Sequence, residues 1–134
     1  MGAVLDAQQR QCDALRYPDI SGYAAAVAAF ARRRRCDLLW PVDVGAHKLM
    51  GAVELLTCGT LETRSFATGV AGRSVLLVAS IAVSASEMAR EAQVARAAGA
   101  THVYGAAVDP RCLSAGLDDS CILSADTATS TRSA

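Results

Sequence analysis

Features that mark several common functional classes are missing from this sequence. Only 4% of its 134 residues are aromatic, and 13 basic residues balance 13 acidic ones, so the net charge predicts no general attraction to nucleic acid or to an anionic membrane. No apolar run reaches the roughly 18 residues of a membrane-spanning helix. The N-terminal segment also has neither the basic start nor the apolar stretch of a secretion signal. We therefore expect a cytoplasmic protein that does not enter a membrane.

Metal, redox and nucleotide motifs are missing too. The five cysteines are scattered and form no CxxC pair, which predicts free thiols in a reducing compartment and no metal site. The glycine patterns of dinucleotide-binding and P-loop proteins do not occur, and neither does the serine motif of the nucleophile elbow. We therefore predict no cofactor from the residues alone. The cysteines are Cys12, Cys36, Cys58, Cys112 and Cys121.

What the sequence does contain is a high proportion of small apolar residues. Hydrophobic residues make up 52% of the chain, which is enough for one domain with a substantial core. The clearest local pattern is a strand, a turn and a helix near the middle. Residues 75–78 form a continuous apolar run, typical of a strand buried on both faces. Ser84 and Glu87 have the spacing of a capping box, which predicts a helix that starts there and stops at Gly99.

Strand and helix patterns alternate through residues 22–108, which predicts an α/β fold with a three-layer parallel sheet and flanking helices. We expect a single domain over 1–123 and a disordered tail over 124–134. Proline at position 18 predicts a break before the first long helix. Expected helices are 4–15, one that starts at Ser21 or Gly22 and ends at the arginines 32–35, 48–56 with Leu49, Val53 and Leu56 inward, and 84–98. Expected strands are 37–42, 61–68, 75–78, 101–108 and 122–123, and 43–47 is an expected turn.

Four consecutive arginines, Arg32 to Arg35, close the first long helix. Cations at a helix C-terminus face the negative end of the helix dipole, which stabilises the helix by about 0.3–1 kcal/mol each at best. Four successive positions point around most of a helix, so they do not form one patch. We interpret the run as a solvated helix end; contact with phosphate, RNA or an acidic partner is the alternative.

Two segments share their spacing with a known family. Residues 40–46, WPVDVGA, are similar to a strand that ends in a VPxxGG turn before a helix, and residues 72–87, GRSVLLVASIAVSASE, are similar to GxxVLLVDDVxTTGxT. RAAGA at 96–100 is similar to the LxxAGA that follows. Together they resemble the type I phosphoribosyltransferase family over about residues 17–109. The resemblance implies that family's fold, and two loops that hold phosphoribosyl pyrophosphate and its magnesium.

The resemblance places candidate ligand-binding residues in both turns. The phosphate-loop positions are vestigial, because the family's two acids, which bind the ribose hydroxyls, are replaced by Ala79 and Ser80, and its loop glycine is replaced by Ala85. Glu87 adds a negative charge where a phosphate should bind. The candidates in the phosphate loop are Ser80, Val83, Ser84, Ala85, Ser86 and Glu87, and those in the pyrophosphate-loop-like turn are Asp43, Val44, Gly45 and Ala46.

A third departure from the family is the connection over 57–73, which is too short for the flexible hood that covers the substrate. We therefore expect a phosphoribosyltransferase-fold protein without catalysis, with no assigned catalytic residue, that acts as a binding, regulatory or assembly subunit. Its expected partners are a second copy or another protein, with a weak phosphate or nucleotide ligand and no nucleic acid. One alternative is a divergent phosphoribosyltransferase that uses phosphoribosyl pyrophosphate, Mg²⁺ and acids from elsewhere; the other is an unrelated small α/β nucleotide- or phosphate-binding protein. The acids in question are Asp43, Asp109, Asp118 and Asp119.

Overall fold

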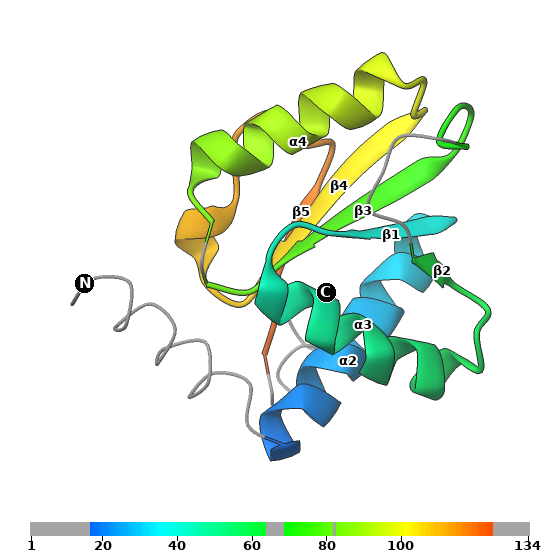
Figure 1. The fold of residues 1–134 in the computed structure, drawn as a ribbon, viewed down its shortest axis with the longest axis vertical. Coiled ribbons are helices and arrows are strands. Elements are labelled where there is room, and N and C mark those ends of the chain that lie inside the picture. The colour runs from blue at the N-terminus through cyan, green and yellow to red at the C-terminus, as the bar shows by residue number, and fades with distance from the viewer. Residues whose placement is uncertain (1–16, 64–68, 82, 125–134) are drawn as a thin grey trace.

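A five-stranded sheet with helices on both faces organises this chain (Figure 1). The computed structural model describes residues 17–63, 69–81 and 83–124. All strand pairs are parallel, in the order β2-β1-β3-β4-β5, which confirms the predicted α/β fold with a parallel sheet. The elements are α2 (Tyr17–Arg34), β1 (Leu38–Pro41), α3 (Val44–Thr57), β2 (Glu62–Thr63), β3 (Ser74–Ala79), α4 (Ala85–Ala97), β4 (His102–Ala107), the short 3-10 helix η1 (Pro110–Cys112) and β5 (Ser120–Ile122).

The central strand is β3, the apolar run that the sequence identifies most clearly. It pairs with β1 on one side and β4 on the other, so that Leu76 lies between Leu39 and Tyr104. Residues 75–79 of this strand are fully buried. A strand with neighbours on both sides and helices above and below exposes neither face to water, which explains why its sequence does not alternate.

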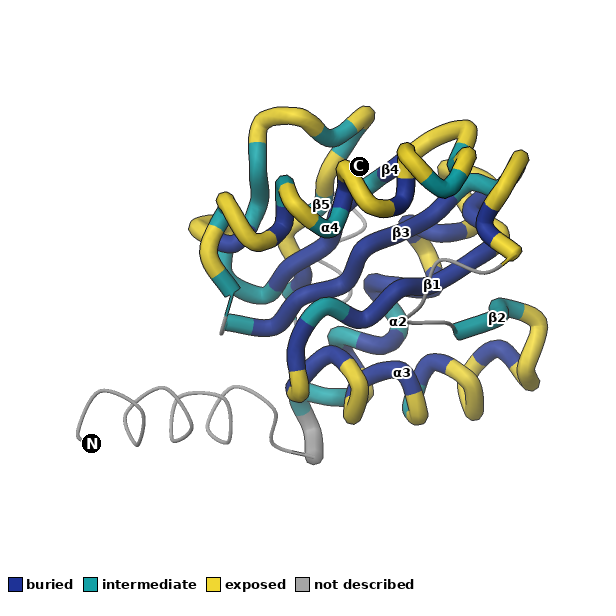
Figure 2. The backbone as a smooth tube through the Cα atoms, turned by 45° about the horizontal axis from the view of Figure 1, so that its top comes forward, coloured by how far each residue is buried: buried dark blue, intermediate teal, exposed yellow. Residues whose placement is uncertain are grey.

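The sheet separates the core into two layers, and Figure 2 shows the helices that cover its two faces. Because successive side chains of a strand point to opposite faces, Leu76 and Leu77 belong to different halves of the core. Leu76 packs in the cluster formed by α2 and α3, which includes Phe30. Leu77 packs in the cluster formed by α4, which includes Met88. The result is the helix–sheet–helix arrangement predicted from the alternation of the elements.

Two predicted helix starts are wrong. The described part of α2 begins at Tyr17, so Pro18 lies inside the helix and not in a break before it. Proline is compatible with the first turn of a helix, because the backbone N–H that it lacks has no intrahelical acceptor there. Helix α3 begins at Val44, within the expected turn 43–47, and the expected inward Leu56 is 50% exposed. Asp43 caps this helix and starts it four residues early.

Other predicted boundaries are shifted or lie outside the described residues. Of the expected strand 61–68, only Glu62 and Thr63 pair, and 64–68 are not described. The last strand is longer than 122–123 and begins at Ser120. The expected helix 4–15 and, apart from Ser124, the expected disordered tail lie outside the described residues. Gly99 follows α4 with φ +101, as its predicted stop requires. In the described ranges, no helix has the length and apolar character needed to cross a membrane.

Replacing Leu77 with alanine will test the central role of β3. The side chain is fully buried between β3 and α4, so the Leu77→Ala variant should lose about 2–5 kcal/mol of unfolding free energy through lost burial and the cavity left behind. The matched control is Leu55→Ala, whose side chain is 84% exposed; it should change the free energy by less than about 0.5 kcal/mol. Urea denaturation measures both values, and equal losses would contradict the assigned core.

Candidate ligand site at the carboxyl edge of the sheet

The carboxyl ends of β1 and β3 meet at the point where the chain changes direction across the sheet. From β1 the chain moves outward to β2, and then returns to the other side of β1 as β3. In parallel α/β sheets the crevice at such a switch point is the usual place for a ligand. Asp43 follows β1 and Ser80 follows β3, so the two segments that share spacing with the phosphoribosyltransferases are neighbours here.

A hydrogen-bonded contact joins these two loops. The Asp43 carboxylate accepts from the backbone N–H of Ser80 and from its hydroxyl, both at 2.9 Å, through the same oxygen Oδ2. Its other oxygen accepts the N–H of Ala46 at 2.8 Å, which caps α3. Asp43 is 9% exposed and Ser80 is fully buried. The carboxylate therefore joins the start of α3 to the end of β3 and faces protein donors.

Helix α4 begins with half of the predicted capping box. The Ser84 hydroxyl accepts the backbone N–H of Glu87 at 3.2 Å, as predicted. The Glu87 carboxylate, however, lies 3.4 Å from that hydroxyl, and the return bond to the backbone N–H of Ser84 is not among the hydrogen bonds of the described residues. Ser86 also lies 2.9 Å from the Ser84 hydroxyl. The three polar side chains at this helix start therefore interact with one another.

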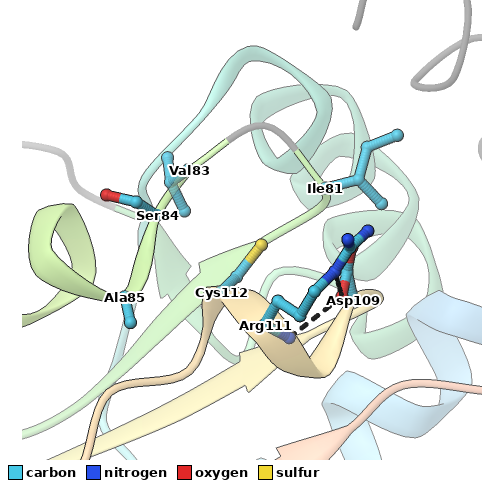
Figure 3. Close-up of a pocket in the computed structure, with 7 residues that line it drawn as sticks. All are labelled: Ile81, Val83, Ser84, Ala85, Asp109, Arg111 and Cys112. Atoms are coloured by element: carbon cyan, nitrogen blue, oxygen red, sulfur yellow. Dashed lines mark hydrogen bonds and ion pairs between the residues drawn. The ribbon is translucent and has the colours of Figure 1, made fainter.

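A cavity of about 360 Å³ opens beside this helix start, between the loop after β3 and the loop after β4 (Figure 3). Its apolar side comes from the loop before α4 and its polar side from η1. Figure 3 shows the Cys112 sulfur pointing toward the loop between β3 and α4. The volume suits a small ligand, because ligand pockets begin at about 300 Å³. The lining residues are Ile81, Val83, Ser84, Ala85, Asp109, Arg111 and Cys112.

The polar rim of the cavity is an ion pair between Asp109 and Arg111. The Asp109 carboxylate accepts from the Arg111 guanidinium at 2.7–3.1 Å and from its backbone N–H at 2.9 Å. This hydrogen bonding, followed by the charge attraction, raises the pKa of Arg111. The pair is adjacent to solvent, since the Arg111 side chain is 82% exposed. A ligand at the rim would therefore contact an arginine whose charge is already balanced by the Asp109 carboxylate.

The Cys112 thiol lies in the cavity wall but is not activated. Burial raises its pKa above the ordinary value, and the backbone hydrogen bond from Val83 opposes this shift. The sulfur lies 3.7 Å from the Ser80 carbonyl oxygen, an acceptor that favours the protonated thiol. Since the thiolate is the nucleophile, Cys112 is suited to packing and not to covalent catalysis.

The structure separates the residues that the sequence suggests for one site. Val83, Ser84 and Ala85 line the cavity. Ser80 is buried below it, whereas Ser86 and Glu87 are exposed. Asp43 to Ala46 form the cap and first turn of α3, with Gly45 and Ala46 buried and Val44 exposed. The predicted role of this turn in binding pyrophosphate stays a prediction.

Sequence reasoning missed most of the far wall of the cavity. Ile81, Arg111 and Cys112 carry no motif, and Asp109 was considered only as a substitute acid. One signal was present: Asp109 directly follows a buried strand, and the carboxyl ends of parallel strands lie at the same edge of a sheet. Among the described residues, no group of three or more histidine, cysteine or acidic side chains is arranged to hold a metal ion.

Substitution of Asp43 will measure the strength of the loop contact. The Asp43→Ala variant leaves the donors of Ser80 and Ala46 without their acceptor, so the unfolding free energy should fall by about 1–3 kcal/mol. The control is Asp37→Ala, because Asp37 also accepts a backbone N–H, from Ser74, but is exposed; it should lose less than about 1 kcal/mol. Chemical denaturation compares the two, and an equal or smaller loss at Asp43 would contradict the proposed contact.

Thiol labelling will test the environment of Cys112. Cys58 is exposed and Cys112 is 1% exposed with a raised pKa, so iodoacetamide at neutral pH should modify Cys58 first. The rate at Cys112 should rise only as the pH increases toward its raised pKa, because only then does thiolate form. Mass spectrometry of the labelled peptides identifies each site. Faster labelling at Cys112 than at Cys58 would show that the thiol is activated.

Comparison with models of known protein families found none that matches the chain, and comparison with curated protein sequences found no match either.

Proposed function

We propose that this chain is a non-catalytic binding or assembly subunit with a phosphoribosyltransferase-like α/β fold. The observation that carries the proposal is the burial of Ala79 and Ser80, the two positions at which the resembled family has acids. Both residues are 0% exposed. Ala79 packs in the core below α4, and Ser80 bonds to Asp43. Neither position presents a group to a ligand.

The phosphate loop supports the same conclusion. Ser84, Ser86 and Glu87 interact with one another at the start of α4. A phosphate at this helix start would compete for the Ser84 hydroxyl and would lie near the Glu87 carboxylate. Two like charges about 4 Å apart repel by about 1 kcal/mol in water and by several times more when they are partly desolvated. The hydrogen bonds of the Ser84 hydroxyl at the start of α4 are therefore made with neighbouring groups of the chain, which disfavours a phosphate there.

The connection between α3 and β3 adds a third argument. Residues 58–73 form it and contain the two-residue strand β2. A lid that excludes water from a reacting phosphoribosyl group must reach over the carboxyl edge. Here β2 is tied to the other half of the connection by the Arg73–Glu62 ion pair at 2.7 Å, and pairs with the first two residues of β1. These contacts place Glu62, Thr63 and Arg73 near the amino ends of the strands.

A second candidate function is the binding of a small ligand without chemistry, and the cavity favours it. The strand order of the sheet is that of doubly wound proteins that bind nucleotides at the carboxyl edge. The cavity lies at this edge, between the loops after β3 and β4 and beside the start of α4. Its mixture of apolar side chains and one neutralised ion pair fits a small molecule with little net charge.

Isothermal titration calorimetry with phosphoribosyl pyrophosphate and Mg²⁺ will test the absence of catalysis. At millimolar ligand we expect no binding heat, and no release of pyrophosphate when nucleobases are added, because no acid follows β3 to bind the ribose. Saturable binding or pyrophosphate release would overturn the proposal in favour of a divergent enzyme. The Glu87→Thr variant is the informative comparison: if the carboxylate at the helix start is what excludes phosphate, this variant alone should gain weak binding.

Light scattering of the purified chain tests the assembly part of the proposal separately. A mass above that of one chain, or a stable complex with a protein recovered by affinity purification, is the expected result. A monomer at all concentrations that recovers no protein would contradict assembly and leave binding of a small ligand as the function to test.

A further inference from the structure

The outer face of α3 carries a stripe of exposed residues. Helix α3 covers one face of the sheet, and Figure 2 shows its exposed positions along the side turned away from that sheet. Val44, Lys48, Gly51 and Leu55 are all exposed and recur at intervals of four, three and four residues, so they lie on one side of the helix. This is the spacing of the seam along which two helices pack. We call these four residues the α3 stripe.

The apolar members of the α3 stripe are far more exposed than the core-facing side of the helix. Val44 is 67% exposed and Leu55 is 84% exposed, the two highest values among the large hydrophobic residues that the structure describes. Leu56, next to Leu55, is half exposed. A single exposed apolar side chain is common on a protein surface, whereas neighbouring ones on one helix indicate an interaction site. The α3 stripe therefore has the character of a surface that another helix covers.

Gly51, in the middle of the α3 stripe, has no role in the packing of its own chain. A glycine inside a helix lowers the stability of the helix relative to alanine. The fold does not require a glycine here, because a Cβ at position 51 would meet no atom within 4 Å and the φ of Gly51 is not positive. What glycine does allow is the close approach of a second backbone. It therefore favours a partner helix that crosses α3 at Gly51.

The charges around Gly51 fit a second copy of the same helix. His47 and Lys48 precede Gly51 by four and three residues, and Glu54 follows it by three. All three side chains are exposed, and within the described ranges Lys48 and Glu54 belong to no ion pair. This order does not complement the helix dipole, since α3 has no acid in its first turn and no base in its last. An antiparallel copy brings the basic end of each helix to the acidic end of the other.

We propose that the α3 stripe is the interface of a symmetric dimer, in which two copies of α3 pack antiparallel and cross at Gly51. A two-fold axis at this point makes the contact self-complementary, because every pairing occurs twice. It places Lys48 at the level of the partner's Glu54, and Leu55 at the level of the partner's His47. A helix of an unrelated protein would use the apolar residues without needing charges balanced about Gly51. The inference rests on the assembly part of the proposed function and names its surface.

The size of this interface predicts a weak dimer. Helix α3 has 14 residues, so it is about 21 Å long. One pair of helices of this length buries less than the roughly 1,000 Å² of a stable interface, so we expect a dissociation constant of about 10–100 µM. The dimer should therefore form at high protein concentration and dissociate on dilution.

Sedimentation velocity of the full chain from about 1 µM to 500 µM tests the proposal, because a dimer of this affinity changes its population over that range. The unsubstituted chain should pass from monomer to dimer. Gly51→Gln should weaken the dimer by at least about tenfold, because two larger side chains then meet where the backbones approach. The monomer has room for this side chain, so circular dichroism should show an unchanged fold. Ala97→Gln, which adds the same side chain to an exposed position of α4, is the matched control and should leave the dimer unchanged.

Charge reversal tests the antiparallel direction. Lys48→Glu or Glu54→Lys alone should weaken the dimer by about tenfold, because like charges then meet at two symmetric positions. The double variant restores opposite charges and should return the dissociation constant to within about threefold of the unsubstituted value. Arg90→Glu, which reverses an exposed charge on α4, should have no effect.

Several results would overturn the dimer. A chain that stays monomeric over the whole range excludes it, together with assembly through a second copy. A dimer that Gly51→Gln leaves intact keeps assembly but places the interface elsewhere. Recovery of a different protein by the unsubstituted chain, lost in Gly51→Gln without any dimer, assigns the α3 stripe to that protein. A double charge variant as weak as the single ones excludes the antiparallel pairing. The absence of catalysis is decided separately, by the titration with phosphoribosyl pyrophosphate.

Discussion

The contact between Asp43 and Ser80 is the interaction on which the carboxyl edge of this protein depends. One carboxylate oxygen accepts both donors of Ser80 and the other caps α3. The buried N–H of Ser80 needs an acceptor there, since a buried unpaired donor costs about 1–3 kcal/mol. The same bonds join the two loops at the switch point of the sheet, where parallel α/β proteins usually hold their ligands.

The cavity that the structure describes lies beside this contact, on the other side of the loop after β3. The cavity lies between the loops after β3 and β4, where Cys112 and the Asp109–Arg111 pair complete its wall. None of these groups has the character of a catalyst. The thiol has a raised pKa because it is buried, and the guanidinium is bound to its neighbouring acid. The character of these groups therefore supports the proposed binding function.

The two edges of the sheet differ in how their charges are arranged. At the carboxyl edge, acids and cations pair within a few residues of each other, as Asp109 and Arg111 do. At the amino edge, Arg34 at the end of α2 pairs with Asp119, which is 85 residues away in the chain, and the guanidinium groups of Arg33 and Arg34 lie over the Phe30 ring.

The sequence by itself determined the elements whose signals are local. The apolar run of β3, the serine that starts α4 and the glycine that follows it depend on residues within one or two turns of each other, and these predictions are confirmed. The parallel α/β sheet followed from the alternation of such elements.

Only the tertiary structure decided the contacts between segments far apart in the chain. Asp43 was predicted in a turn, but it caps α3 because Ser80 and Ala46 hold its carboxylate. Leu56 fits an apolar helical stripe, yet the early start of α3 and the position of the sheet leave it half exposed. The row from Phe30 through Tyr104 to His102 exists because α2 packs on β4. Such contacts depend on strand order and register, and no local spacing encodes which strand lies beside which.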